Sequence, residues 1–403
     1  MNPTRRQFLR TCAFVSATLG TGSANRAATA APLTLSAATI PDPDGHHPAL
    51  KLKGDWLVIT ISDGRHTGLG EISHSRDDAA CLRRVRELFA AHVAPRRPSR
   101  ALLDELARGP FALIEPNLVT ATAISGIDQA LHDLVAQREG VPVWQLYTAK
   151  PVQESVPYYL STNRALRERA PADFIKVTAA ALALGGNAVK VTPFEAVKDA
   201  TDKRAAAGEG FARIEAVRAA YPRISLRIDC HEHFTPEDLA ILLPRFARYK
   251  LEWLEEPCPA GPALAALRAE AAMPFATGEM FFGETRFREL IEQRQADVIM
   301  PDPKFVGGFG PLVRVCRMAE KLRGQVSPHN PSGAVATYAS VHAAAVSAAV
   351  TSTELILTSD PARQPGIELL SGERLRIPRT AGWGLSLEQL TAQTGAKFAP
   401  LPV

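Results

Sequence analysis

From about residue 151 to residue 375, short apolar segments alternate with longer segments whose apolar residues recur at helical spacing. Each short segment has the length and the β-branched or aromatic content of a buried strand. The predicted strands are VPYYLS, AVKVTPF, SLRID, LEWLE, PFATGE, DVIMPD, GQVSPH and TELIL. Strands that alternate with helices in this way predict an α/β fold built on a parallel (β/α) barrel.

Residues 32–150 show a different pattern. The segment DWLVITISDG (55–64) alternates like a strand and ends in Asp63-Gly64, a hairpin signal, and HTGLGEIS follows it. Helical spacing then dominates from about Asp77 to Gln137. The pattern predicts a small α+β domain that precedes the barrel.

The first 31 residues fit neither domain. Arg5 and Arg6 are followed by a modest apolar run, and Ala28-Thr29-Ala30 stands before Ala31. This pattern is typical of a twin-arginine export signal with an A-x-A cleavage site; the alternative is a basic, disordered N-terminus. We therefore expect residues 1–31 to be removed and the mature protein to be soluble and periplasmic.

The composition is that of a globular protein with more than one domain, since 46% of the 403 residues are hydrophobic and 22% are charged. The net charge of +4 includes no basic run, which argues against nucleic acid as a partner. No apolar run reaches the length of a membrane span. The cysteines beyond the signal are scattered without a C-x-x-C pair, so no zinc ribbon or disulfide framework is expected. We expect a homo-oligomer.

Six ionisable residues end successive predicted strands. Neighbouring members of the set are 23 to 27 residues apart, about one strand and one helix. The set is Asp229, Glu255, Glu279, Asp302, His329 and Glu354. Barrel enzymes place their catalytic groups at the carboxyl ends of the strands, so this spacing predicts an active site there.

Strand parity assigns directions to the segment ISLRIDCH, because side chains two residues apart share a face. If Ile224, Leu226 and Ile228 face the outer helices, Asp229 and His231 point into the barrel mouth. Cys230 and Glu232 then point away, and His233 stays unassigned.

Three of the six residues are carboxylates on adjacent strand ends, namely Asp229, Glu255 and Glu279. A set of oxygen ligands that leaves positions for water and substrate suits Mg²⁺ better than Zn²⁺. Parity with Trp253 favours Glu255 over Glu256 as the inward residue of LEWLEEP. The alternative is that these carboxylates are solvated or cap the following helices.

His329 and Asp302 end neighbouring strands, so Asp302 can accept a hydrogen bond from one ring nitrogen of His329. Such a bond fixes the tautomer and raises the basicity of the other nitrogen, as a general base requires. We expect Lys304, two residues after Asp302, to be solvated or structural.

Several motifs together resemble the enolase superfamily, specifically its mandelate racemase subgroup. They are SGIDQALHDL (125–134), Lys190 in VKVTPF, Asp229-x-His231, WLEEP, ATGE, MPDPKFVGG and SPHNPSG. The likeness runs from about residue 33 to the end. It implies a modified (β/α)₇β TIM barrel over residues 151–375 and an α+β capping domain over residues 32–150, completed by residues 376–403.

The resemblance also implies a chemistry. Mg²⁺ is expected on Asp229, Glu255 and Glu279, and a base removes the proton α to the carboxylate of a small-molecule substrate, giving an enediolate. Glu354 matches a position that hydrogen-bonds the substrate carboxylate. Lys190 matches a lysine that contacts it, although an ion pair with a metal-site carboxylate is the alternative.

The chain departs from the racemases of the subgroup at Thr192, where they carry the second lysine of a Lys-x-Lys motif. One face of the substrate therefore lacks its usual base, which favours β-elimination of water. His231 resembles the general acid of sugar-acid dehydratases. The prediction is a dehydratase that converts a sugar acid to a 2-keto-3-deoxy acid, with His329, oriented by Asp302, as the base.

Two other functions stay open, namely a racemase or epimerase that uses His329 and His231 on opposite faces, and a non-catalytic periplasmic binding protein. The identity of the acid depends on loops. We expect contacts to polyol hydroxyls from residues after the first barrel strand and contacts to the distal end from the capping domain. These residues are Tyr158, Tyr159, Asn163 and Arg164, and His46, His47 and His74. The alternative for the three histidines is that they are plain surface residues.

Overall fold

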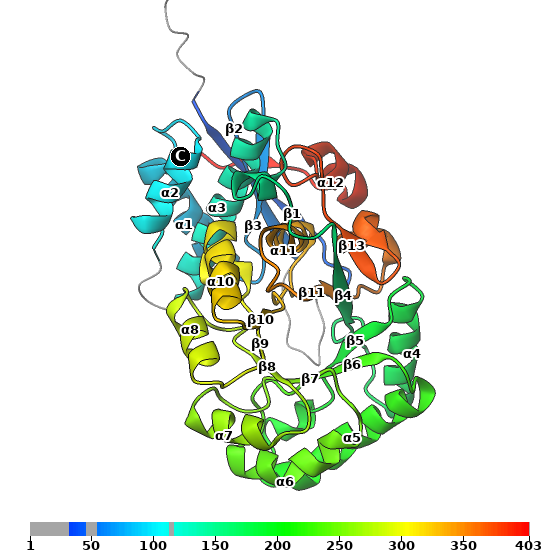
Figure 1. Cartoon of the computed structure of the whole chain (residues 1–403). Coiled ribbons are helices and arrows are strands. Elements are labelled where there is room, and N and C mark those ends of the chain that lie inside the picture. Colours follow the sequence, from blue (N-terminus) through cyan, green and yellow to red (C-terminus); the bar gives the residue numbers. More distant parts are fainter. Residues whose placement is uncertain (1–31, 46–54, 113–116, 403) are drawn as a thin grey trace, which may run out of the picture. The chain divides into compact units, whose positions relative to one another are not determined.

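The computed structural model describes residues 32–45, 55–112 and 117–402. The predicted export signal, His46 and His47 lie outside these residues. The compact unit that begins at Pro32 contains an N-terminal sheet with helices and a barrel (Figure 1).

The N-terminal sheet is antiparallel, with strand order β14-β1-β2-β3. Its strands are β1 (Thr34–Ile40), β2 (Trp56–Ser62), β3 (Thr67–Glu71) and β14 (Ala399–Pro400). The predicted hairpin at Asp63-Gly64 joins β2 to β3, and Gly64 adopts a positive φ of 85° that favours glycine. The fourth strand comes from the C-terminal tail.

Three helices belong to this domain and were predicted as one helical region; α3 packs on the sheet, and the other two pack against α3. They are α1 (Asp78–His92), α2 (Arg100–Arg108) and α3 (Leu118–Glu139). Each begins at a residue whose side chain accepts a hydrogen bond from the first turn, namely Asp77, Ser99 and Asn117. Helix α3 lies so close to β3 that a Cβ atom at Gly68 would lie 2.0 Å from the carbonyl oxygen of Ala130.

Eight parallel strands form the barrel, in chain order from β4 to β11, and Figure 1 shows them around its centre. Pairing of β4 with β11 joins the first barrel strand to the last. A bridge between Val326, in β10, and Val350, just before β11, closes the barrel. The strands are β4 (Ser155–Ser161), β5 (Ala188–Val191), β6 (Ser225–Asp229), β7 (Trp253–Glu255), β8 (Phe275–Thr277), β9 (Val298–Ile299), β10 (Gln325–Val326) and β11 (Thr353–Ile356). All eight predicted strands are present, although several are shorter than expected.

Helices follow the barrel strands. The helices are α4 (Pro171–Leu182), α5 (Lys203–Ala220), α6 (Pro236–Ala247), α7 (Pro262–Glu270), α8 (Thr285–Glu292), α9 (Pro303–Val306), α10 (Phe309–Lys321) and α11 (Ala334–Val346). The C-terminal segment adds β12 (Leu370–Ser371), β13 (Arg374–Arg376) and α12 (Leu387–Thr394). In this segment, strand β13 pairs with β4.

Helix α3 connects the N-terminal sheet to the loops at the carboxyl ends of the barrel strands. Ser125 donates a hydrogen bond to the carbonyl of Pro303 (3.0 Å), and Asp128 accepts one from the amide of Gly310 (3.2 Å). Ser125 and Asp128 therefore hold the segment that follows Asp302.

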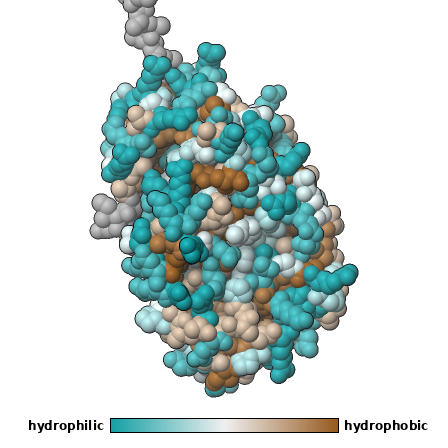
Figure 2. Space-filling model, in the orientation of Figure 1, coloured by the Kyte–Doolittle hydropathy of each residue, from teal (hydrophilic) through white to brown (hydrophobic). Residues whose placement is uncertain are grey.

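The face shown in Figure 2 is mostly hydrophilic, with hydrophobic residues in small groups. Among the described residues, no helix is both long and apolar enough to cross a membrane. The four cysteines in the described part of the chain are buried and free.

Candidate active site

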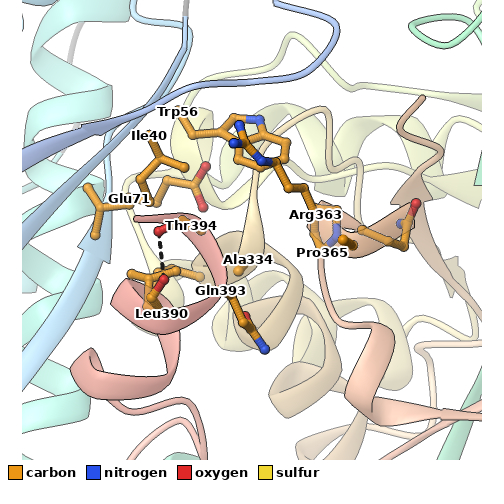
Figure 3. A pocket seen from close by; sticks show the side chains of 13 residues that line it. Ile40, Trp56, Glu71, Ala334, Arg363, Pro365, Leu390, Gln393 and Thr394 are labelled. Carbon is orange, nitrogen blue, oxygen red and sulfur yellow. Dashed lines mark hydrogen bonds between the residues drawn. The ribbon is translucent and has the colours of Figure 1, made fainter. Parts of the chain in front are cut away.

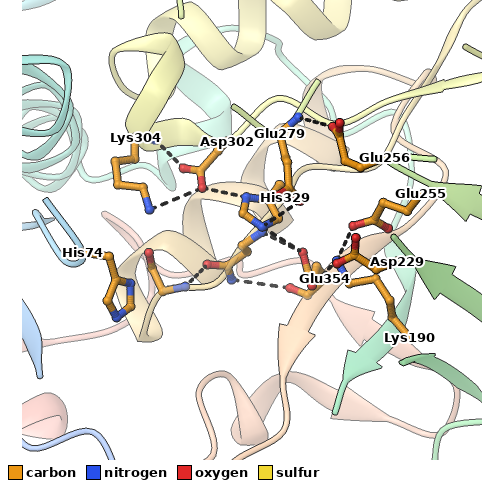
Figure 4. A network of polar contacts seen from close by, with 12 residues as sticks. His74, Lys190, Asp229, Glu255, Glu256, Glu279, Asp302, Lys304, His329 and Glu354 are labelled. Carbon is orange, nitrogen blue, oxygen red and sulfur yellow. Dashed lines mark hydrogen bonds and ion pairs between the residues drawn. The ribbon is translucent and has the colours of Figure 1, made fainter. Parts of the chain in front are cut away.

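A cavity of about 470 Å³ lies at the carboxyl ends of the barrel strands. Its walls include most of the residues predicted for the site. These are Asn163, Lys190, Asp229, His231, Glu279, His329 and Glu354. Figure 4 shows that Asp302 and Glu255 join the same network of polar contacts from the strands beside them. The structure therefore gathers residues that are far apart in the sequence.

The three predicted metal ligands come together. One oxygen atom from each of Asp229, Glu255 and Glu279 lies within 4.8 Å of the others. Asp229 ends β6, Glu255 ends β7, and Glu279 follows β8. Glu279 Oε2 is buried and accepts no hydrogen bond from the described residues. This oxygen lies 3.3 Å from His329 Nε2 but accepts no hydrogen bond from it, and a buried acceptor of this kind beside two more carboxylates fits a hard divalent cation.

Glu256 points elsewhere, as strand parity predicted. Its Oε1 accepts hydrogen bonds from the amides of Gly278 (2.7 Å) and Glu279 (3.3 Å). Burial raises the pKa of Glu256 well above its ordinary value. Glu256 therefore holds the backbone of Glu279. Glu255 instead belongs to the cluster of Asp229, Glu255 and Glu279, which we call the acidic group.

The sequence analysis did not predict the hydrogen bond that orients Glu255. Trp253 Nε1 donates a hydrogen bond to Glu255 Oε2 (2.9 Å). The guanidinium of Arg227 lies over the Trp253 ring at 4.2 Å and the Tyr159 ring at 4.6 Å. Because Trp253 and Glu255 are two residues apart on one strand, their shared face was the available signal. Tyr159 is fully buried in the barrel interior and does not line this cavity, so the structure does not support its predicted contact with substrate hydroxyls.

Lys190 is buried among the carboxylates. Its Nζ contacts Glu255 Oε1, lies 2.8 Å from Glu354 Oε1 and lies 3.8 Å from Asp229 Oδ2. Burial alone would lower the pKa of Lys190, but Glu255 and Glu354 raise it well above the ordinary value. Burial also raises the pKa of Glu255, to about 8, although Lys190 opposes this. The structure contains the ion pair that was the alternative for Lys190, and contact with a substrate carboxylate stays a prediction.

His329 and Asp302 form the predicted pair. His329 Nδ1 lies 3.0 Å from Asp302 Oδ2, and His329 Nε2 lies 3.3 Å from Glu279 Oε2. Burial opposes a charge on His329, but Glu279 and Asp302 outweigh it and raise the pKa to about 9. The contact with Asp302 leaves Nε2 directed toward the acidic group.

Lys304 is not solvated. It is only 5% exposed, and its Nζ lies 3.6 Å from Asp302 Oδ2. Asp302 also accepts a hydrogen bond from the Lys304 amide (2.7 Å), which begins the short helix α9. Burial would raise the pKa of Asp302, but Lys304 and His329 hold it below the ordinary value. The structural alternative for Lys304 therefore fits, since Lys304 is buried in α9 and pairs with Asp302.

His231 lies across the barrel from His329. It follows β6, whereas His329 follows β10, and three strands separate β6 from β10 in either direction around the barrel. Its Nε2 lies 2.9 Å from Asp229 Oδ2, and its side chain is 36% exposed. Burial would lower the pKa of His231, but Asp229 raises it to about 9. As expected, Cys230 is buried in the hydrophobic core and Glu232 is exposed.

The outer wall of the cavity is polar. Asn163 Oδ1 accepts hydrogen bonds from both terminal nitrogens of Arg169, at 3.3 and 3.4 Å. Arg164 is buried, pairs with Asp42 and lies 2.9 Å from His74 Nε2. Tyr158 does not line this cavity; it contacts Gly372 near the opposite end of the barrel.

Two family models match the chain. Residues 55–147 match the mandelate racemase/muconate lactonizing enzyme N-terminal domain, and residues 174–390 match the enolase C-terminal domain-like family. The second match alone covers more than half of the chain. Together they span the N-terminal domain and most of the barrel.

Curated relatives carry the names of sugar-acid dehydratases. The chain is 27% identical to a D-galactonate dehydratase of Ralstonia pickettii over 87% of its own length and 93% of the relative's. It is 25% identical to a D-xylonate dehydratase of Haloferax volcanii, with coverage of 86% and 84%.

A solved structure has the same fold. It is that of a mandelate racemase/muconate lactonizing enzyme-like protein from Rubrobacter xylanophilus. It matches with a TM-score of 0.76 at 24% identity and covers 91% of this chain and 98% of the other.

Proposed function

Because the chain belongs to the enolase superfamily, with its mandelate racemase/muconate lactonizing enzyme N-terminal domain, we propose that it is a Mg²⁺-dependent dehydratase of a sugar acid. The names of its curated relatives support the substrate class. The polar wall around Asn163 and Arg164 supports a polyol substrate.

His329 takes the proton from carbon 2 of the substrate in this proposal. Nε2 is the reacting atom, because Nδ1 contacts Asp302 at 3.0 Å. A carbon acid next to a carboxylate is very weak, so the developing enediolate needs electrostatic stabilisation. Lys190 holds the carboxylate end by its charge, and Glu354 holds the ammonium group of Lys190 at 2.8 Å. A hydrogen bond from Glu354 to the substrate carboxylate would require the protonated form of Glu354. A bound Mg²⁺, held by Asp229, Glu255 and Glu279, would supply Lewis-acid stabilisation of this charge.

His231 completes the elimination. As the bond between carbon 2 and carbon 3 gains double-bond character, the carbon 3–oxygen bond breaks and His231 gives a proton to the departing hydroxyl, which leaves as water. The enol product then tautomerises to a 2-keto-3-deoxy acid. The exposed ring of His231, on the far side of the cavity from His329, suits this role.

One observation carries the proposal: two histidines reach one cavity from opposite sides of the barrel, and the more buried one contacts a carboxylate outside the acidic group. The test is a screen of sugar acids, including D-galactonate and D-xylonate, for 2-keto-3-deoxy products with Mg²⁺ present. We expect at least one acid to react and added chelator to stop the reaction. The absence of any keto product across the library would contradict the proposal.

An epimerase is the second candidate, since His231 and His329 face the cavity from opposite sides. Incubation of the reacting acid in D₂O separates the two functions. A dehydratase yields keto acid, whereas an epimerase yields deuterated substrate of inverted configuration. Thr192, where racemases of the subgroup have a lysine, favours the dehydratase. A pure binding protein would not need the contact between His329 and Asp302.

We also propose export through the twin-arginine route. The support is the sequence of residues 1–31 alone. Replacement of both Arg5 and Arg6 by lysine should leave the protein in the cytoplasmic fraction, while the natural chain reaches the periplasm. Equal distribution of the two forms would contradict export by this route.

A further inference from the structure

Glu71 is a buried carboxylate at the end of β3 that the proposed mechanism does not use. It is 3% exposed and lies among Ile40, Trp56 and Ala334 (Figure 3). Its Oε1 accepts hydrogen bonds from Ser73 Oγ (2.6 Å) and from the amide of Gly333 (2.6 Å). Its Oε2 accepts one from the amide of Ala336 (3.1 Å).

These amides belong to the start of α11. The N-cap position of that helix is Gly333, which has no side chain to accept hydrogen bonds from the first turn. Glu71 supplies the missing acceptor from another part of the chain, and its charge is favourable at a helix N-terminus. A Cβ atom at Gly333 would lie 3.1 Å from Glu71 Oε1 and 3.0 Å from Trp56, so a side chain at this position would crowd both residues.

The segment just before α11 carries His329. Its barrel end is held by Glu354, whose Oε2 accepts a hydrogen bond from the amide of Asn330 (3.0 Å). Asn330 in turn accepts one from the amide of Ser332 (3.1 Å). The other end is the first turn of α11. The position of His329 therefore depends on two carboxylates, one from the barrel and one from the N-terminal sheet.

We propose that Glu71 is a positioning residue for His329. By fixing the first turn of α11, it holds the segment 329–333 so that Nε2 of His329 faces the α-carbon of the substrate. The role in turnover rests on the proposed function. It makes the N-terminal sheet a part of the catalytic apparatus without direct contact between Glu71 and the substrate.

The first test is Glu71→Ala, assayed with the best acid from the screen. We expect kcat to fall about 10²-fold, because a small displacement of a catalytic group has an effect of this order. KM and the Mg²⁺ affinity, measured by calorimetry, should stay close to those of the natural chain. Glu71→Gln keeps one oxygen for the Gly333 amide but turns an NH₂ group toward the Ala336 amide, so it should restore only part of kcat.

Asp133→Ala is the matched control. Asp133 is also a buried carboxylate of the N-terminal domain, and it accepts hydrogen bonds from the amides of Leu69 and Trp383, both at 2.8 Å. Neither amide belongs to the segment that carries His329. We expect this variant to lose thermal stability and to keep kcat when it is assayed below its melting temperature. An equal loss of kcat in both variants would overturn the proposal.

Hydrogen exchange gives a readout that does not depend on activity. In Glu71→Ala the amides of Asn330, Ser332 and Ala336 should exchange about tenfold faster or more, because a buried donor loses its acceptor or its anchor. The same amides should be unchanged in Asp133→Ala. Should Glu71→Ala fail to fold, Glu71→Gln replaces it in both measurements.

The two failures can be told apart. If the natural chain reacts with no acid, the proposed function fails and the exchange measurement still tests whether Glu71 holds the segment. If the natural chain reacts but Glu71→Ala keeps its kcat or its slow exchange, the positioning role of Glu71 is wrong.

Discussion

The two histidines of the cavity differ in burial and in partner. The side chain of His329 is 11% exposed, whereas that of His231 is 36% exposed. His329 contacts Asp302 through Nδ1, and Asp302 lies outside the acidic group, although Nε2 also lies 3.3 Å from Glu279 within the group. His231 contacts Asp229, which belongs to the group. His329 thus has a partner, Asp302, that is not a predicted metal ligand, whereas the partner of His231, Asp229, is one.

This difference indicates which histidine acts as the general base. A general base needs a fixed ring and a fixed tautomer, and Asp302 provides both for His329. His231 has a more accessible ring, and the carboxylate that it contacts is a predicted metal ligand. We infer that proton abstraction belongs to His329 and that departure of the hydroxyl belongs to His231.

The largest effect is expected from His329→Asn. Without the base, kcat should fall by about 10²–10⁴-fold, and the C2 proton of the substrate should no longer exchange with D₂O. Turnover assays and ¹H NMR measure the two effects. A variant that folds as shown by its melting curve and still exchanges the C2 proton would assign the base to another residue.

His231→Asn should also reduce dehydration, by about 10²–10⁴-fold, because the leaving hydroxyl loses its proton donor. Exchange of the C2 proton should persist, since His329 and Asp302 are intact. Loss of exchange together with dehydration would mean that both histidines are needed for proton abstraction.

Asp302→Asn should have a smaller effect, about 10–100-fold on kcat, because His329 remains but loses its orienting carboxylate. KM should change little. Asp302 also accepts a hydrogen bond from the Lys304 amide at the start of α9. Melting curves must therefore show that the variant is folded before its kcat is compared. An unchanged kcat would show that His329 needs no partner.

Trp253→Phe tests the support of the acidic group. Removal of the hydrogen bond to Glu255 Oε2 should weaken Mg²⁺ binding by about 10–100-fold, the usual effect of losing a partner of a metal ligand. Calorimetry measures this affinity in the absence of substrate. Tight binding by the variant would mean that Lys190 suffices to orient Glu255.

The sequence predicted the barrel because its strands and helices alternate with regular spacing. The same spacing predicted Asp229, Glu255, Glu279, Asp302, His329 and Glu354, which the structure brings together at one end of the barrel. Parity along β7 selected Glu255 over Glu256. These inferences worked because they depend on local periodicity.

The supports of the site were not predictable in this way. Glu71 and Gly333 are 262 residues apart, and nothing local to either residue indicates the contact. The pairing of Lys304 with Asp302 depends on the start of α9, and Tyr159 packs in the barrel interior and does not line the cavity. Such contacts depend on tertiary packing.

The most direct test compares the natural chain, His231→Asn and His329→Asn by ¹H NMR in D₂O, with Mg²⁺ and the best acid from the screen. The account predicts keto acid from the natural chain, loss of the C2–H signal without keto acid from His231→Asn, and no change with His329→Asn. Loss of the C2–H signal in His329→Asn, or inverted substrate without keto acid from the natural chain, would contradict it.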